Sequence, residues 1–319
     1  MKGRVLVFGG SGFVGRATVK RLLEAGYAVV MANRQQAHWG DANPSRVAVL
    51  QCNRQKRAQV EAAVRAHDDW TAIVDFTSFQ AADVAPILEV YAERRELPQQ
   101  EEDFAVFPED LELRERLSAE DDYGAGKLLV EQHLSARFPT LALRLPDVYG
   151  PYDESRFWKY FLWLSVADQF PVFLKTKREC CFVFSGDVAR AIVLALDASP
   201  RPRASVNVAT LRTTLQEFLA LFARCAGFKH AIKFTWEESE EGFCEEFLPS
   251  VDYNVSTAKL PSVLPLFVST PVEEAMREMA AFYKRAWDRH PAERQEVLAE
   301  LPRAWHSAIR RRAIALADE

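Results

Sequence analysis

The sequence has few cysteines, no long apolar run and no excess of positive charge. Its five cysteines are odd in number and lack C-x-x-C spacing, which argues against a disulfide framework and a zinc site. The six histidines are scattered without the spacing of metal ligands, so no metal is expected. No apolar run approaches the roughly 18 residues that a membrane span requires. With a formal charge of -5, general binding to nucleic acid or to a membrane surface is not expected either. We therefore expect a soluble, cytoplasmic protein.

At 319 residues and 49% hydrophobic content, the chain can bury a large core. Apolar runs and amphipathic segments alternate along its first part. Strands are predicted at 5–8, 28–32, 47–51 and 71–76, and helices at 16–25, 58–66 and 81–96. This alternation predicts an α/β fold with a parallel sheet.

The second part of the chain is less regular. A charged, proline-containing segment at 93–120 is predicted to be an exposed loop, and an aromatic segment near 156–164 to be core or pocket lining. Helices are predicted at 123–136, 188–196 and 214–226, and strands at 141–145 and 206–209. Ser185, Gly186 and Asp187 are expected to cap the second of these helices, and Thr214 and Glu217 have capping-box spacing at the start of the third.

The glycine-rich segment after the first predicted strand carries the strongest functional signal. Gly10, Gly12 and Gly15 fit G-x-G-x-x-G, and Gly9 adds the wider G-x-x-G-x-x-G spacing. Such glycines allow a sharp turn, close approach of the backbone to a pyrophosphate, and close packing of helix on strand. Because a predicted strand precedes them and a helix follows, we interpret the segment as a dinucleotide cradle rather than a tight turn without a ligand.

A second constellation is Tyr123 and Lys127, four residues apart on one face of a predicted helix. A lysine ammonium near a tyrosine hydroxyl favours the phenolate and lowers the pKa of the tyrosine. The pair is therefore suited to proton exchange with a substrate hydroxyl or carbonyl.

Four segments in this order, GGSGFVG (9–15), YGAGK (123–127), RLPDVYGP (144–151) and FVFSGDVARAI (182–192), resemble the extended, or atypical, short-chain dehydrogenase/reductase family. Its members include NAD(P)-dependent epimerases and dehydratases. The resemblance implies a Rossmann-type doubly wound parallel sheet with a smaller C-terminal substrate lobe. The domains it implies are 1–150 for NAD(P) binding, 151–290 for the substrate lobe with 182–210 returning to the first domain, and 291–319 as a helical tail.

The resemblance also implies roles for individual residues. Tyr123 becomes the acid/base, and Lys127 its partner and a ligand of the cofactor ribose. The implied cofactor-binding residues are Gly9, Gly10, Ser11, Gly12, Phe13, Val14, Gly15, Asn33, Arg34, Asn53, Phe76, Thr77, Lys127 and Pro146.

The end of the second predicted strand departs from the family. NAD-specific members have an acidic residue there, which binds the ribose 2′-hydroxyl, whereas this chain has Asn33 and Arg34. A guanidinium suits a 2′-phosphate, so NADP(H) is expected to be preferred over NAD(H). The alternative is that Arg34 points into solvent. Asn53 replaces the usual adenine-contacting aspartate and can still bond the edge of the base.

The interval between Asp75 and Tyr123 is shorter than in most family members. It predicts that one sheet strand and one helix are missing between residues 80 and 120, together with the catalytic serine or threonine that normally ends that strand. Thr77 or Ser78 is the alternative source of this hydroxyl.

Two functional hypotheses follow. The first is an NAD(P)-dependent oxidoreductase or epimerase/dehydratase that transfers hydride to or from a sugar nucleotide or similar polar metabolite, with a homodimer expected by analogy. The second is a shortened, catalytically weak nucleotide-binding protein with a sensing, scaffolding or RNA-associated role. Candidate contacts for an anionic substrate are Arg156, Trp158, Lys159 and Lys175, unless these form an exposed basic and aromatic surface.

Overall fold

The computed structural model describes residues 2–34, 47–94, 122–153, 156–166, 169–173, 179–229, 233–237, 255–289, 291–292 and 295. The chain forms two compact units. Unit 1 comprises 1–143, 191–206 and 262–265, and unit 2 comprises 144–190, 207–261 and 266–319. Apart from residues 291–292 and 295, the predicted helical tail lies outside the described residues.

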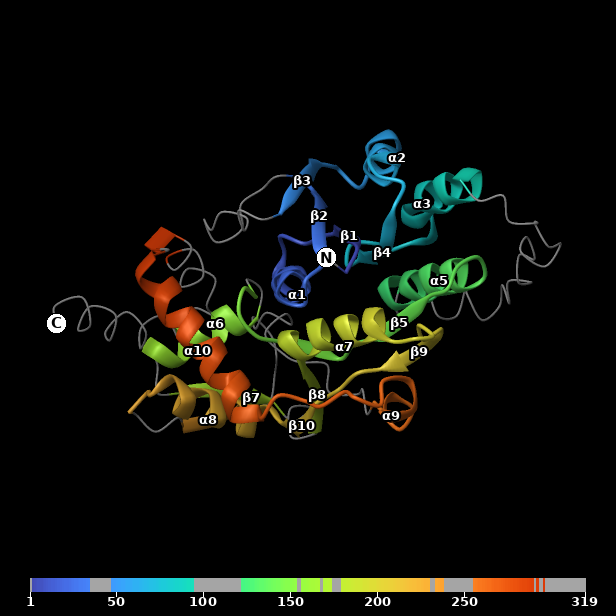
Figure 1. Ribbon diagram of the computed structural model, residues 1–319. Helices are drawn as coiled ribbons and strands as arrows, with labels where there is room; N and C mark the ends of the chain where they lie inside the picture. The colour runs from blue at the N-terminus through green and yellow to red at the C-terminus, as the bar shows by residue number, and fades with distance from the viewer. Residues whose placement is uncertain are drawn as a thin grey trace. The chain divides into compact units, whose positions relative to one another are not determined.

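Unit 1 is built on a four-stranded parallel sheet (Figure 1). Its strands are β1 (Arg4–Phe8), β2 (Ala28–Asn33), β3 (Ala48–Gln51) and β4 (Trp70–Asp75). Their order is β3-β2-β1-β4, so the chain moves outward from β1 to β3 and then returns to the other side of β1. This order and the parallel pairing confirm the predicted Rossmann-type sheet.

Alternate residues of β1 face two different helical layers. Val5 and Val7 pack with α1 (Phe13–Glu24), whereas Leu6 and Phe8 pack with α2 (Arg57–Arg65) and α3 (Ala81–Arg94). Figure 1 shows α1 on one side of this sheet and α2 and α3 on the other. All four β1 side chains are buried. Each contributes about 1.5–3 kcal/mol by leaving water, which makes β1 the centre of the unit's core.

The β4 side of unit 1 is less well covered. After α3 come α5 (Asp122–Ser135) and β5 (Leu141–Arg144), and β5 pairs with β9 (Ala204–Asn207) rather than with β4. All six β4 residues are only half-buried, and so are residues 141–143 of β5. Between β4 and β5 the described residues include no strand. The predicted loss of a strand and helix falls largely on residues 95–121, which lie outside the described part.

Unit 2 contains a second sheet of order β10-β8-β6, in which β8 is parallel to β6 and antiparallel to β10. A separate parallel pair is formed by β7 and β11. The bounds are β6 (Asp147–Tyr149), β7 (Gln169–Phe173), β8 (Glu179–Phe184), β10 (Leu211–Thr214), β11 (Lys233–Glu237), α6 (Phe157–Val166), α8 (Leu215–Ala226) and α10 (Val272–Arg289). Two further helices, α7 (Ser185–Asp197) and α9 (Leu260–Val263), each have residues in both units.

Aromatic side chains dominate the core of unit 2. Trp158 and Phe161 of α6 stack 5.9 Å apart between ring centres, and the Tyr283 ring lies 5.5 Å from Trp158. The Tyr283 hydroxyl lies 3.0 Å from the carbonyl oxygens of both Gly150 and Asp153 and shares its single hydrogen between them. The aromatic segment predicted as core or pocket lining is thus a packed core, with these rings buried.

Helix boundaries agree with the sequence best where capping chemistry is local. Thr214 and Glu217 form the expected reciprocal capping box, and α8 begins at the next residue after Thr214. By contrast, α7 begins at Ser185, so the three residues expected as its cap form its first turn. Likewise α1 begins at Phe13, three residues before the predicted start. Gly15 therefore lies within its first turn.

Candidate functional site

The glycine turn connects β1 directly to α1 in unit 1. Gly9 has a φ of 79°, a conformation that favours glycine, and its carbonyl accepts the Gly12 N–H at 3.1 Å. A Cβ on Gly15 would lie 2.1 Å from the Gly9 carbonyl oxygen, so only glycine permits this close approach of helix and turn. Gly12 is the N-cap and makes no side-chain capping bond, which leaves the first-turn N–H groups clear of a competing side chain. This turn fits a pyrophosphate at the positive end of α1.

Three other predicted residues of this region lie in or directly after the glycine turn. Ser11 is buried, and its carbonyl accepts a bond from Arg16 Nε at 3.0 Å. Phe13 and Val14 form the start of α1. The Ser11 carbonyl thus links the turn to the first turn of α1.

The end of β2 carries no acidic side chain. Asn33 is its buried last residue, and the Asn33 carbonyl accepts the N–H of Cys52 at 2.7 Å. Arg34, the next residue, is exposed. Its guanidinium is thus accessible to an anion at this end of the strand.

Asn53 shapes the turn that leads into α2. Its Oδ1 accepts the N–H of Gln55 at 3.0 Å, and its own N–H donates to Gln59 Oε1 at 2.7 Å. These bonds give Asn53 a structural role in the turn. Its predicted contact with the base edge stays a prediction.

The turn after β4 is organised by the Asp75 carboxylate. Oδ1 accepts the Thr77 N–H at 2.8 Å and the Thr77 hydroxyl at 3.3 Å, and Oδ2 accepts the Ser78 hydroxyl at 2.7 Å. Arg54 Nη2 donates to the same Oδ2 and to Ser78 Oγ. A Cβ on Gly9 would lie 2.6 Å from Thr77 Cγ2 and 3.3 Å from Phe76 Cβ, so this turn packs against the first glycine.

Both hydroxyls of this turn are engaged within the turn itself. The Thr77 and Ser78 hydroxyls both donate to Asp75, and Ser78 is 4% exposed. A hydroxyl whose single hydrogen is donated to Asp75 cannot at the same time donate to a substrate oxygen. The structure therefore does not support Thr77 or Ser78 as the missing catalytic hydroxyl.

Helix α5 carries Tyr123 and Lys127 and contacts the same turn. Lys127 Nζ donates to the Ser78 carbonyl at 2.7 Å and lies 4.2 Å from the centre of the Phe79 ring. A Cβ on Gly126 would lie 2.2 Å from the Phe79 carbonyl oxygen, so α5 packs on the turn without an intervening side chain. Through Ser78 and Thr77, the Tyr/Lys helix is thus connected to the glycine turn.

Tyr123 and Lys127 are close to each other and differ in exposure. Lys127 Nζ lies 5.5 Å from the centre of the Tyr123 ring, and the Tyr123 side chain is 62% exposed. Burial lowers the pKa of Lys127, while the nearby Asp75 and Asp83 carboxylates act in the opposite direction. The arrangement offers an accessible phenol beside a half-buried ammonium.

The remaining predicted positions belong to unit 2. Pro146 precedes β6 in unit 2. The interpretation of Arg156, Trp158 and Lys159 as an exposed surface is wrong, because Trp158 and Lys159 are buried and Arg156 is ion-paired with Asp147. Lys175 lies outside the described residues.

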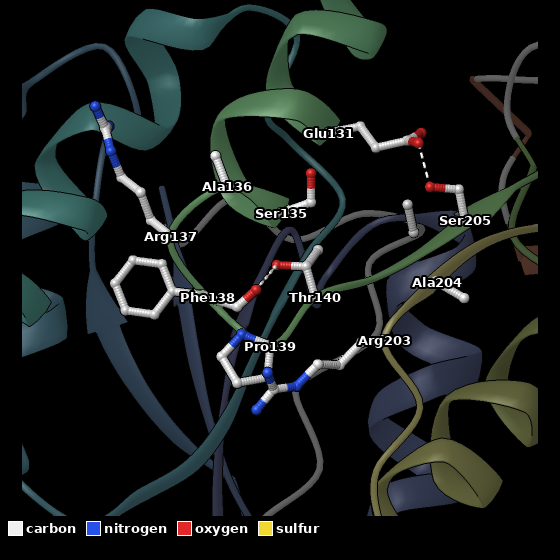
Figure 2. Close-up of a pocket in the computed structure, with 11 residues that line it drawn as sticks. Glu131, Ser135, Ala136, Arg137, Phe138, Pro139, Thr140, Arg203, Ala204 and Ser205 are labelled. Carbon is white, nitrogen blue, oxygen red and sulfur yellow. Dashed lines mark hydrogen bonds between the residues drawn. The ribbon is translucent and has the colours of Figure 1, made fainter. Parts of the chain in front are cut away.

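Unit 1 also contains a pocket of about 530 Å³ that shares no residue with this site. Figure 2 shows its lining from the end of α5, from residues 137–140 and from residues 203–205. The Ser205 hydroxyl donates to Glu131, and the Thr140 hydroxyl donates to the Phe138 carbonyl at 3.1 Å.

The described residues show neither a metal site nor a membrane span. The described residues contain no group of three or more His, Cys, Asp or Glu side chains arranged to hold a metal. Within the same residues, every helix is too short or too polar to cross a bilayer.

Sequence reasoning did not identify Arg54 and Asp75 as part of the site. The available signal was positional, since Asp75 ends a predicted strand and Arg54 follows another. Carboxyl ends of parallel strands meet at one edge of the sheet, where ligands bind in open α/β folds.

Comparison with known proteins gives a consistent assignment of the fold. The NAD dependent epimerase/dehydratase family model matches residues 5–100 and 88–209. The two matches meet within the interval that the sequence analysis identifies as shortened. No curated protein matches the chain in sequence.

Solved structures share this fold at low sequence identity. The Bordetella bronchiseptica enzyme WbmH, in complex with NAD+, is 15% identical with a TM-score of 0.67, over 88% of this chain and 98% of that one. The Thermotoga maritima UDP-glucose 4-epimerase, with UDP-glucose, is 16% identical with a TM-score of 0.64, over 89% and 99%. The Bacillus anthracis dTDP-glucose 4,6-dehydratase, in complex with NAD, is 13% identical with a TM-score of 0.67, over 91% and 99%.

Proposed function

This chain belongs to the NAD-dependent epimerase/dehydratase family, and we propose that it is an NAD(P)-dependent enzyme acting on a hydroxyl or carbonyl carbon of a sugar nucleotide or similar polar metabolite. The observation that carries the proposal is the contact of Lys127 Nζ with the Ser78 carbonyl at 2.7 Å. It joins the proton-transfer helix to the turn that packs on Gly9. In this proposal, residues that contact one another both bind the nucleotide and transfer the proton.

Each residue has a defined task in this proposal. The backbone of residues 9–15 holds the pyrophosphate, and a bound nicotinamide supplies hydride transfer. Tyr123 exchanges a proton with the substrate oxygen, for which its exposed hydroxyl-bearing ring is suited. The Lys127 ammonium favours the phenolate form of Tyr123 and is also the donor for a ribose hydroxyl.

NADP(H) is the proposed cofactor in preference to NAD(H). The exposed Arg34 guanidinium follows Asn33, where a carboxylate would repel a 2′-phosphate. Of the solved structures with this fold, WbmH was determined with NAD+ and the dehydratase with NAD. The preference for NADP(H) therefore depends on Arg34 alone.

A sugar nucleotide is proposed as substrate because one structure of this fold, the Thermotoga maritima epimerase, was determined with UDP-glucose. We also propose a homodimer, by analogy of fold. Light scattering of the purified protein at several concentrations tests it, and a monomer mass throughout would reject it.

The second candidate function is nucleotide binding with little or no catalysis. It is favoured by the bonding of the Thr77 and Ser78 hydroxyls to Asp75, which leaves this turn without a hydroxyl for the substrate. An oxyanion-stabilising donor of this kind contributes about 10²- to 10³-fold in rate. The retained Tyr123 and Lys127 favour the first candidate.

Fluorescence titration of the protein with NADPH and NADH, followed by a substrate screen at the nicotinamide absorbance, tests the proposal. Tighter binding of NADPH and sustained hydride exchange with a sugar nucleotide are expected. Binding without any exchange would support the second candidate, and absence of binding would reject both.

A further inference from the structure

Arg54 lies at the point in the sheet where ligands of open α/β folds bind. It follows β3, yet its guanidinium carbon lies 4.4 Å from the centre of the Phe8 ring, at the end of β1, and its Nη2 bonds to Asp75, at the end of β4. Strands β1 and β4 are neighbours on either side of the point where the strand order reverses. The crevice outside the carboxyl ends of two such strands is the usual ligand site.

The bonding of Arg54 is incomplete. Its side chain is only 13% exposed, and Nη2 donates to both Asp75 and Ser78. Nε and Nη1 are buried and have no hydrogen-bond partner among the described residues. A buried charged donor without an acceptor is costly, and a ligand acceptor removes that cost.

A purely structural role does not account for these two donors. Only Nη2 bonds to Asp75 and Ser78. A lysine, whose ammonium carries its donors on one nitrogen, could make the same two bonds. The Phe8 ring supports the guanidinium from one side and limits its reorientation. The remaining N–H groups are therefore preorganised for an acceptor that the described residues do not supply.

We propose that Nε and Nη1 of Arg54 donate hydrogen bonds to the adenosine diphosphate portion of the bound dinucleotide. The inference rests on the proposed function, since it assumes that a dinucleotide occupies the glycine turn. Gly9, the first residue of that turn, follows Phe8 directly in the chain. Phosphate oxygens and adenine ring nitrogens are acceptors that both NADH and NADPH present. Arg54 thus contributes affinity for both, whereas Arg34 distinguishes between them.

The direct test is titration of Arg54→Met with NADPH, NADH and ADP-ribose. All three ligands are expected to bind about 10- to 100-fold more weakly than to the wild type, the range of charge-assisted hydrogen bonds. Arg57→Met is the matched control, because Arg57 is an exposed arginine on α2 that pairs with Glu61. Its affinities are expected to equal those of the wild type.

A second set of variants separates ligand contact from support of the turn. Asp75→Asn retains Arg54 while removing the carboxylate charge, and the double variant Arg54→Met/Asp75→Asn leaves no unpaired buried charge. The double variant is expected to unfold at a temperature close to that of Asp75→Asn and still to lose the full 10- to 100-fold in affinity. Asp75→Asn alone is expected to lose distinctly less.

Three results would overturn the role of Arg54. They are equal losses in Arg54→Met and Asp75→Asn, a loss confined to NADPH, and unchanged binding of ADP-ribose by Arg54→Met. A wild-type protein that binds no dinucleotide would instead reject the proposed function itself. The wild-type titration, performed first, therefore distinguishes the two failures.

Discussion

Substitution of Gly126 by alanine tests how closely α5 packs on the turn after β4. In an exposed helix this change stabilises by about 1 kcal/mol, because glycine is a poor helix former. Here the new Cβ would lie 2.2 Å from the Phe79 carbonyl oxygen, and real Cβ atoms essentially never come closer than 3.0 Å. Either α5 or the turn must therefore move by about 0.8 Å or more.

The cost of this movement follows from the contacts it disturbs. Overpacking costs about 1–3 kcal/mol. Losing the bond from Lys127 Nζ to the Ser78 carbonyl, 2.7 Å long, costs a further amount of about 1.5–3 kcal/mol, since its donor is charged. After the helix-propensity gain is subtracted, Gly126→Ala is expected to destabilise unit 1 by about 1.5–5 kcal/mol.

Thermal unfolding followed by circular dichroism measures the effect. A loss of about 1.5–5 kcal/mol corresponds to a Tm lower by roughly 3–20 °C in a unit of this size, at about 2–4 °C per kcal/mol. Gln132→Ala, at an exposed position of the same helix, serves as control and is expected to leave Tm unchanged within about 1–2 °C. A Gly126→Ala protein as stable as the wild type, or more stable, would refute the close packing of α5 on Phe79.

Three further outcomes are expected. Tyr123→Phe should abolish turnover with the substrate found in the screen while leaving the Kd for NADPH within about two-fold, and unchanged turnover would remove Tyr123 from the mechanism. Arg34→Met should weaken NADPH binding by about ten-fold and leave NADH unchanged, as judged by parallel titrations, and equal effects on both would contradict the 2′-phosphate contact. Burial and a 2.7 Å hydrogen bond to Asp197 raise the pKa of Tyr27 to about 12. Because the unfolded chain loses this proton nearer pH 10, the resulting stability is present below about pH 10 and lost between pH 10 and 12. Tyr27→Phe should flatten that alkaline loss in urea titrations at several pH values, whereas an unchanged slope would exclude Tyr27 as its source.

Local sequence patterns predicted the parts of the fold that depend on neighbours in the chain. The run from Val5 to Phe8 is apolar on both faces because each face meets a helical layer, and this continuous pattern identified the strand. The capping box at Thr214 was equally readable, since its two partners lie three residues apart. The start of α1 was predicted too late because glycine is in general a poor helix former. At position 15 a glycine is nevertheless required, since a Cβ there would lie 2.1 Å from the Gly9 carbonyl oxygen.

The contacts that unite the candidate site were not predictable in this way. Lys127 meets Ser78 across 49 positions, and Arg54 meets Asp75 across 21. Both pairings depend on strand order and on where α5 packs, neither of which leaves a local signature. Sequence therefore identified Tyr123 and Lys127 as a pair but gave no indication of the turn on which they rest.

The division of the chain between the two units limits how such a protein can be cut or recombined. Unit 1 is encoded in separate segments, and residues 191–206 belong to it although they follow much of unit 2. This late segment supplies Val193 and Leu196 to the core beside α1, and Asp197 to a 2.7 Å ion pair with Lys2. A fragment ending at residue 143 would expose that core and lose the partner of Lys2. Unit 1 therefore cannot be isolated by cutting the chain after residue 143, because that fragment lacks residues 191–206.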